Sequence, residues 1–138
     1  MALTERSLKQ LVGVHPDLQA IVMRASEGPL YFIVTEGLRS AERQAYLVAH
    51  GKSRTLRSRH RTGHAVDLAV VRDGVAMWDW PSYALLARIV KAAAAELDLP
   101  VEWGGDWQSF RDGPHFQLPW ATHPGGEDVF PPRTTEPA

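Results

Sequence analysis

Two histidines and an aspartate occupy positions from which they could hold a metal ion. His60 and Asp67 belong to the segment Ser58–Asp67, which runs into an apolar, strand-like stretch at residues 65–71. An unpaired carboxylate in such a stretch would cost several kcal/mol, so Asp67 needs a strong cationic partner. His115 begins a second short strand-like segment. Zinc accepts two histidines and one aspartate as protein ligands, and the fourth tetrahedral position is then left for the water that a hydrolase needs.

A second carboxylate and an arginine could complete the chemistry. Asp112 shortly precedes His115, within Asp-Gly-Pro, which is turn-forming in its own right. Its functional interpretation is a general base that accepts a proton from a metal-activated water and delivers it to the leaving amine. Arg39 lies between a strand and a helix, where it would form a surface salt bridge, hold a substrate carboxylate or stabilise an oxyanion. Spacing alone also allows a structural alternative, in which His60 and Asp67 form a buried pair and His115 is unrelated to them.

The other histidines carry less information. His15, His50 and His123 are isolated in the sequence, and an isolated histidine is usually structural. We therefore predict structural roles for these three. His64 lies in the same segment as His60, and we retain it as an alternative outer partner of the metal ligands.

Composition excludes several classes of protein. The 138 residues, 44% of them hydrophobic, predict one folded domain with a substantial core, and we expect a monomer. A net charge of -1 and a pI near 6.6 argue against a broad surface for nucleic acid or anionic lipid. The absence of cysteine excludes disulfides and thiolate metal sites. No stretch approaches the roughly 20 apolar residues of a membrane span, and the first residues lack a signal-peptide pattern, so we expect a soluble cytoplasmic product without stable membrane association.

A local basic cluster departs from this balanced composition. The structural interpretation of this cluster is a solvated loop, and the functional interpretation is a surface that attracts an acidic substrate. Its members are Arg54, Arg57, Arg59 and Arg61.

Hydrophobic periodicity and turn signals predict a small α+β domain. Apolar residues recur at helical spacing after Pro16 and after the predicted N-cap residue Ser40. Short β-branched and aromatic runs predict antiparallel strands, and in the last of them a period of two places His115 and Gln117 on one face, away from Phe116. The expected helices lie between residues 16 and 27, 41 and 50, and 80 and 97, the strands at 30–35, 65–71, 75–78 and 115–118, and a polar loop at 52–62.

Two parts of unequal size follow from this pattern. We expect residues 1–120 to form the catalytic domain, with a short antiparallel sheet, packed helices and the zinc site in a surface cleft. Residues 121–138 are rich in proline and glycine and poor in apolar residues, which predicts a flexible tail.

The spacing of the two motifs resembles a known family of enzymes. Ser58-x-His60-x-x-Gly63-x-Ala65-x-Asp67, followed by Asp112-Gly-Pro-His115-Phe, resembles the D-alanyl-D-alanine carboxypeptidase-like zinc peptidases, which include the VanY and VanX enzymes. The likeness extends to residues 35–40 with Gln44, which are similar to the family's arginine-bearing segment. The resemblance implies a zinc ion held by His60, Asp67 and His115, a catalytic carboxylate at Asp112, and a substrate-binding or oxyanion-stabilising role for Arg39.

The second motif narrows the resemblance. The dipeptidase branch usually carries Glu-x-x-His there, whereas Asp112-Gly-Pro-His115 is more similar to the phage endolysins that cut the L-alanyl-D-glutamate bond of peptidoglycan stems. This likeness implies a zinc endopeptidase that acts on stem peptides in the host periplasm after a holin opens the membrane. A D-alanyl-D-alanine carboxypeptidase and a non-catalytic, zinc-stabilised wall-binding module are the alternatives, although a purely structural site would need no Asp112.

Overall fold

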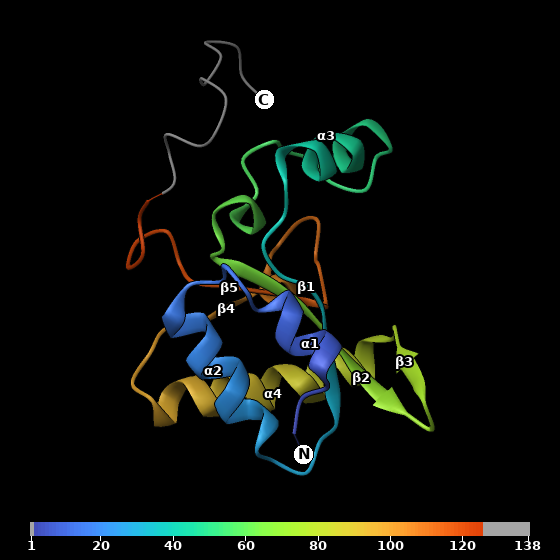
Figure 1. Ribbon diagram of the computed structural model, residues 1–138, viewed down its shortest axis with the longest axis vertical. Helices are drawn as coiled ribbons and strands as arrows, with labels where there is room; N and C mark the ends of the chain where they lie inside the picture. Colours follow the sequence, from blue (N-terminus) through green and yellow to red (C-terminus); the bar gives the residue numbers. More distant parts are fainter. Residues whose placement is uncertain (1, 126–138) are drawn as a thin grey trace.

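A five-stranded antiparallel sheet lies at the centre of the chain, with helices on both sides (Figure 1). The computed structural model describes residues 2–125. Four strands follow the order β1-β2-β5-β4, and β3 pairs with the far end of β2. The elements in chain order are α1 (Glu5–Gln10), α2 (Pro16–Ser26), β1 (Phe32–Glu36), α3 (Ala41–Ala49), the 3-10 helix η1 (Arg59–Thr62), β2 (Ala65–Arg72), β3 (Val75–Met77), α4 (Trp80–Glu96), β4 (Glu102–Trp103), the 3-10 helix η2 (Gly104–Asp106) and β5 (His115–Gln117).

Strand β2 is the longest strand and fixes the positions of its neighbours. Its register places Glu36 of β1 opposite Asp67, and Asp67 opposite His115 of β5. Directly opposed residues of antiparallel strands project from the same face of the sheet. The pairing with β1 shifts between Val34 and Glu36, an irregularity of the kind that redirects side chains beside active sites. The sheet therefore presents a row of polar side chains across three neighbouring strands.

The hydrophobic core lies between the sheet and two helices. Figure 1 shows α2 and α4 together on one side of the sheet, whereas α3 lies on the other side. Both core helices turn an apolar stripe inward, as the periodicity predicts. The best buried core side chains are at most 1% exposed, and they include Leu18 and Ile21 of α2, Leu86 and Val90 of α4, and Phe116 of β5. This packing supports β2 and β5 from behind, so their opposite face is available for polar residues.

The predicted α+β domain is confirmed, and two local elements differ from the prediction. Helix α1 was not expected, because its six residues contain no amphipathic run; it is instead held by Ser7, whose hydroxyl accepts a hydrogen bond from the backbone N–H of Val34 at 3.0 Å. The expected loop at 52–62 ends in η1. Of the predicted tail, residues 126–138 lie outside the described part of the chain.

Candidate metal centre and active site

The two histidines and the aspartate predicted as metal ligands converge in three dimensions. Asp67 and His115 are cross-strand partners in β2 and β5, and His60 approaches from η1. The Oδ1 atom of Asp67 lies 3.2 Å from Nε2 of His60 and 3.5 Å from Nδ1 of His115. The two imidazole rings meet edge to face, with their centroids 5.1 Å apart. One ligand-type atom from each residue thus lies within 4.8 Å of the other two.

The sequence between Ser58 and Gly63 explains how His60 reaches this position. Ser58 caps η1, and its hydroxyl accepts a hydrogen bond from the backbone N–H of His60 at 3.2 Å. Gly63 ends η1 in the left-handed region, with φ 78°. A Cβ atom at this position would lie 2.2 Å from the carbonyl oxygen of Gly13. Only glycine satisfies both the conformation and the contact, and the chain can turn from η1 into β2 immediately after it.

Each of these two histidines has a protein oxygen within hydrogen-bonding distance of its outer ring nitrogen. Nδ1 of His60 lies 2.9 Å from the carbonyl oxygen of Gly37, which can only accept, so Nδ1 carries the proton. Nε2 of His115 lies 2.7 Å from Oε1 of Gln117, and the Gln117 amide donates to Glu102 at 3.0 Å. This orientation of the amide assigns the proton of His115 to Nε2. The remaining ring nitrogens, Nε2 of His60 and Nδ1 of His115, both face the shared carboxylate.

This set of donors fits a zinc ion. Burial raises the pKa of Asp67, but the charge and hydrogen bonds of His60 and His115 outweigh burial and hold the pKa far below its ordinary value. Asp67 is therefore an anion, and such a partly buried carboxylate is stable only with a cationic partner beside it. Imidazole nitrogens and a carboxylate oxygen suit zinc. Outer acceptors that fix the histidine tautomers are the usual surroundings of such a site.

Sequence reasoning assigned no role to three of these partners. Gln117 was correctly placed on the face of His115 by the period of two, and that alternation was the available signal. Glu102 pairs with Gln117 in the register of β4 and β5, which only the folded sheet specifies. The carbonyl of Gly37 carries no side-chain signal.

Arg39 is buried beside the proposed metal ligands. Its side chain is 8% exposed, its Nε donates to Glu36 at 2.6 Å, and its Nη1 donates to Gln44 at 2.8 Å. Its Nη2 lies 3.8 Å from Oδ2 of Asp67. Arg39 thus bridges the two acidic residues that face each other across β1 and β2. The alternative of a surface salt bridge is excluded by this burial.

Asp112 has a turn role and also contributes to the cleft. Its backbone N–H donates to the carbonyl of Gly104 at 3.0 Å, and its own carbonyl accepts from the backbone N–H of His115 at 3.3 Å. Its side chain lines the same cleft as Asp67. Burial and then the negative charge of Asp67 raise the pKa of the Asp112 carboxyl. The turn and the carboxylate in the cleft are compatible, because the turn uses only backbone groups.

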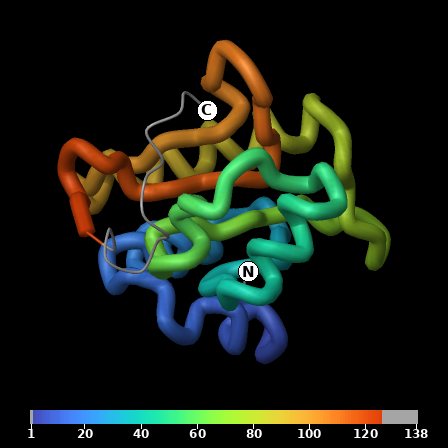
Figure 2. Tube along the Cα trace, turned by 90° about the horizontal axis from the view of Figure 1, so that it is seen from above, coloured from blue at the N-terminus to red at the C-terminus, as the bar shows by residue number. Residues whose placement is uncertain are grey.

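One cleft contains all five residues that the sequence singled out. It has a volume of about 780 Å³, and its lining includes Arg39, His60, Asp67, Asp112 and His115. Two loops form its mouth, at residues 51–58 and 107–112. Figure 2 shows these loops, the first green and the second orange, beside each other. The ring of Trp107 packs 5.1 Å from the ring of His115, centroid to centroid, so one wall of the cleft is aromatic.

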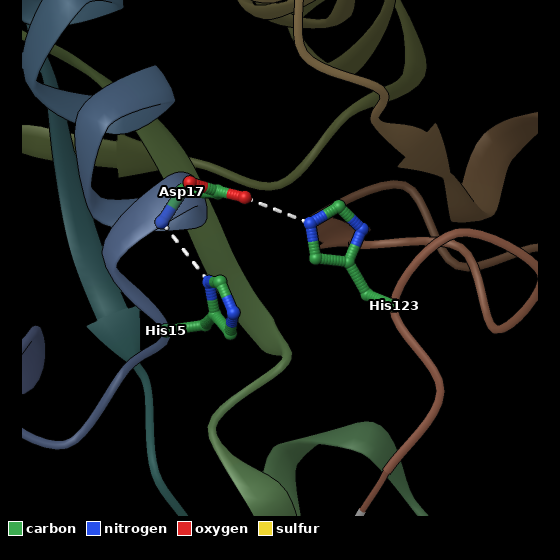
Figure 3. Close-up of side chains that lie close together, drawn as sticks. All are labelled: His15, Asp17 and His123. Atoms are coloured by element: carbon green, nitrogen blue, oxygen red, sulfur yellow. Dashed lines mark hydrogen bonds and ion pairs between the residues drawn. The ribbon is translucent and has the colours of Figure 1, made fainter.

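A second group of histidines lies at the start of α2 (Figure 3). Nδ1 of His15 caps this helix by accepting the backbone N–H of Asp17 at 3.0 Å, and Nε2 of His123 lies 2.8 Å from Oδ2 of Asp17. His64 packs against His15, with ring centroids 5.4 Å apart, and so faces this group rather than the three proposed metal ligands. Ligand-type atoms of His15, Asp17 and His123 also lie within 4.8 Å of one another. The lone pair of His15 Nδ1 is already used by the helix cap. The cap formed by His15 and the pair formed by Asp17 and His123 therefore explain this group without a metal ion.

Comparisons with known proteins agree with the fold. Residues 1–118 match the family model described as phage L-alanyl-D-glutamate peptidase. The L-alanyl-D-glutamate peptidase of Escherichia phage T5 is 32% identical over 127 residues, which cover 88% of this chain and 92% of that protein. The crystal structure of the Serratia marcescens L-Ala D-Glu endopeptidase ChiX superimposes with a TM-score of 0.83 at 47% identity, covering 90% of this chain and 95% of ChiX. The D,D-dipeptidase VanXYg shares the fold alone, with a TM-score of 0.52 at 19% identity over 76% of this chain and 50% of VanXYg.

The fold, which is that of ChiX, and the match over residues 1–118 place the chain among the peptidoglycan peptidases. Within that group, the chain belongs to the phage L-alanyl-D-glutamate peptidase family. No helix among residues 2–125 combines the length and the apolar character needed to cross a membrane.

Proposed function

We propose that this chain is a zinc-dependent endopeptidase that hydrolyses the L-alanyl-D-glutamate bond of peptidoglycan stem peptides. The observation that carries the proposal is the convergence of His60, Asp67 and His115 in a cleft that also contains Asp112 and Arg39. The names of the relatives indicate which bond is cut, and the residues of the cleft are suited to amide hydrolysis. Because a single chain provides all five residues, we expect the monomer to be the active form.

His60, Asp67 and His115 would hold the zinc ion. When bound, zinc supplies Lewis-acid chemistry, which polarises a carbonyl and lowers the pKa of water to about 7. The carbonyl of Gly37 and the amide of Gln117 keep the ring protons on the outer nitrogens, so the inner nitrogens stay available as ligands. The protein thus selects the histidine tautomers before the metal arrives.

Two residues carry the remaining steps in this proposal. Asp112 accepts the proton of the attacking water and delivers it to the amine that leaves. Arg39 stabilises the negative charge that develops on the carbonyl oxygen of the scissile bond. Its hydrogen bonds to Glu36 and Gln44 fix the guanidinium in advance, so little reorganisation accompanies the reaction.

Digestion of purified sacculi tests the bond that is cut. The proposal predicts new N-terminal D-glutamate on the released peptides and glycan strands that keep only L-alanine, both measurable by mass spectrometry. Released D-alanine without a new glutamate amine would instead establish the carboxypeptidase alternative. Binding of sacculi without any new terminus would establish a wall-binding module.

A variant at Asp112 separates holding the metal from using it. Asp112→Asn preserves size and the backbone turn but removes the proton acceptor. It should fold and bind zinc while losing about 10² to 10⁴ in rate. Near-normal turnover of this variant would leave Asp112 with its turn role alone.

A further inference from the structure

The arginine side chains that line the cleft differ in the partners that their guanidinium groups contact. Arg39 is committed to two acceptors inside the protein, as described above. Nη2 of Arg59 donates to the carbonyl oxygens of Leu118 and His123 at 3.0 and 2.6 Å. Arg111 donates from Nε to the carbonyl oxygen of Gly105 at 2.9 Å and lies over the ring of Trp80. Arg59 and Arg111 are therefore occupied in maintaining the walls of the cleft, and Arg39 is fixed in the position from which it stabilises the oxyanion.

Arg54 is held in a different way. Its Cζ atom lies 3.3 Å from the centroid of the Phe110 ring, so the guanidinium rests on an aromatic face. Within residues 2–125, no carboxylate forms an ion pair with Arg54. A guanidinium that stacks through its face keeps the N–H donors of its edge available, in a geometry that matches a carboxylate. Arg54 and Phe110 come from the two loops at the mouth of the cleft, and both line it.

Phe110 is costly to the fold in two respects. Its backbone adopts φ 54°, in the left-handed region that is unfavourable for a bulky side chain. The residue is also 61% exposed, although a phenylalanine normally contributes through burial. Strained residues of this kind concentrate at binding sites, where the surrounding structure maintains them for a function. The contact that Phe110 makes with Arg54 supplies such a function, because the ring fixes the position of an otherwise mobile cation.

The chemistry of the substrate provides the matching group. A glutamate residue has two carboxyl groups, and only one of them continues the peptide chain. The residue on the amine side of an L-alanyl-D-glutamate bond therefore bears a free carboxylate close to the bond that is cut. This carboxylate enters a cleft that already contains Glu36, Asp67 and Asp112, so it needs a cation of its own.

We propose that Arg54, stacked on Phe110, binds the free carboxylate of the glutamate residue and thereby determines the specificity of the cleft. The proposal rests on the proposed function and refines it. Arg39 stabilises the oxyanion, whereas Arg54 binds the free carboxylate of the substrate. Lys52 lies in the same loop and also lines the cleft. Its flexible ammonium group has no aromatic support among the described residues and binds a planar carboxylate less selectively than a guanidinium does.

Two peptides that differ in one group test this assignment. Both contain the L-alanyl-D-glutamate bond, and the free side of the glutamate is a carboxylate in one and a carboxamide in the other. We expect the native zinc-loaded chain to cleave the carboxylate peptide with a kcat/KM about 10- to 100-fold higher, as a charge-assisted hydrogen bond allows. Arg54→Gln should bring the ratio of the two values close to one, and Phe110→Leu should lower the ratio partly.

Lys52→Gln is the matched control, because it removes the same charge from the same loop and should retain the native ratio. An equal fall of the ratio in Lys52→Gln and Arg54→Gln would reduce the effect to general electrostatics and overturn the assignment. A ratio that stays high in Arg54→Gln, with both peptides slowed equally, would mean that Arg54 only shapes the loop. Equal cleavage of both peptides by the native chain would refute the inference while leaving the proposed function intact. Cleavage of neither peptide would refute the proposed function.

Discussion

Asp67 and His115 are directly opposed in adjacent antiparallel strands, and Oδ1 of Asp67 lies 3.5 Å from Nδ1 of His115. Opposed residues of a sheet keep their separation because the ladder of backbone hydrogen bonds fixes it. Two of the three proposed metal ligands are thus positioned by paired strands of the sheet. The third, His60, is added by a short capped turn that packs against the same strand.

Loss of any one ligand should release the metal. We expect His60→Ala, Asp67→Ala and His115→Ala each to lose most bound zinc, because a three-ligand site cannot hold the ion with two. Metal content after dialysis measures this directly, and His50→Ala, whose ring stacks on Tyr46 away from the cleft, is the control. Chelation should abolish hydrolysis by the native chain, and added zinc should restore it. Full zinc occupancy in two of the three ligand variants would contradict the ligand assignment.

The sequence singled out these three residues because their chemistry leaves a strong local signature. An unpaired aspartate within an apolar strand would be energetically costly, so its presence indicates a cationic partner. A glycine and a serine at fixed distances from His60 indicate a specific turn. The strands were predictable because short runs of β-branched and aromatic residues mark them, with a period of two in the last one. Arg39 was predicted to face a cleft, and it does.

The remaining features depend on contacts between distant segments. The pairing of Glu102 with Gln117 follows from the register of β4 and β5, and neither residue indicates the other in the sequence. The contact between Arg54 and Phe110 joins two loops whose separation no local pattern encodes. Helix α1 escaped prediction because Ser7, rather than an apolar stripe, ties it to β1.

Gln117 should control the affinity for zinc without touching the ion. In Gln117→Leu, Nε2 of His115 loses its acceptor, so the ring is free to change its tautomer and orientation. We expect zinc affinity to fall about 10- to 100-fold, as is typical for outer partners of metal ligands. Competition with a chromogenic chelator measures the affinity independently of hydrolysis. Gln108→Leu, at an exposed position, is the control, and equal affinities in the two variants would remove Gln117 from the site.

Two glycines with the same backbone conformation provide a matched test of the turn before β2. Gly63 and Gly74 have φ 78° and 77°, but a Cβ atom would lie 2.2 Å from the Gly13 carbonyl oxygen at the first position and within 4 Å of nothing at the second. Gly74→Ala should therefore lower the free energy of unfolding only by the cost of the left-handed conformation, about 1–2 kcal/mol. Gly63→Ala should lose clearly more stability, together with zinc. Equal losses of unfolding free energy would show that the close approach to Gly13 is unimportant.

His64 should make the fold sensitive to acid. Burial and then the charge of Arg59 lower the pKa of His64 from 6.5 to about 4, with smaller contributions from His15 and His123. Between these two pH values the unfolded chain binds a proton at His64 that the folded chain does not bind, so the free energy of unfolding falls as the pH is lowered from about 6.5 to about 4. Urea titrations across this range, at one zinc concentration, should give a steeper fall for the native chain than for His64→Gln. Parallel curves for the two chains would mean that His64 titrates normally in the folded protein.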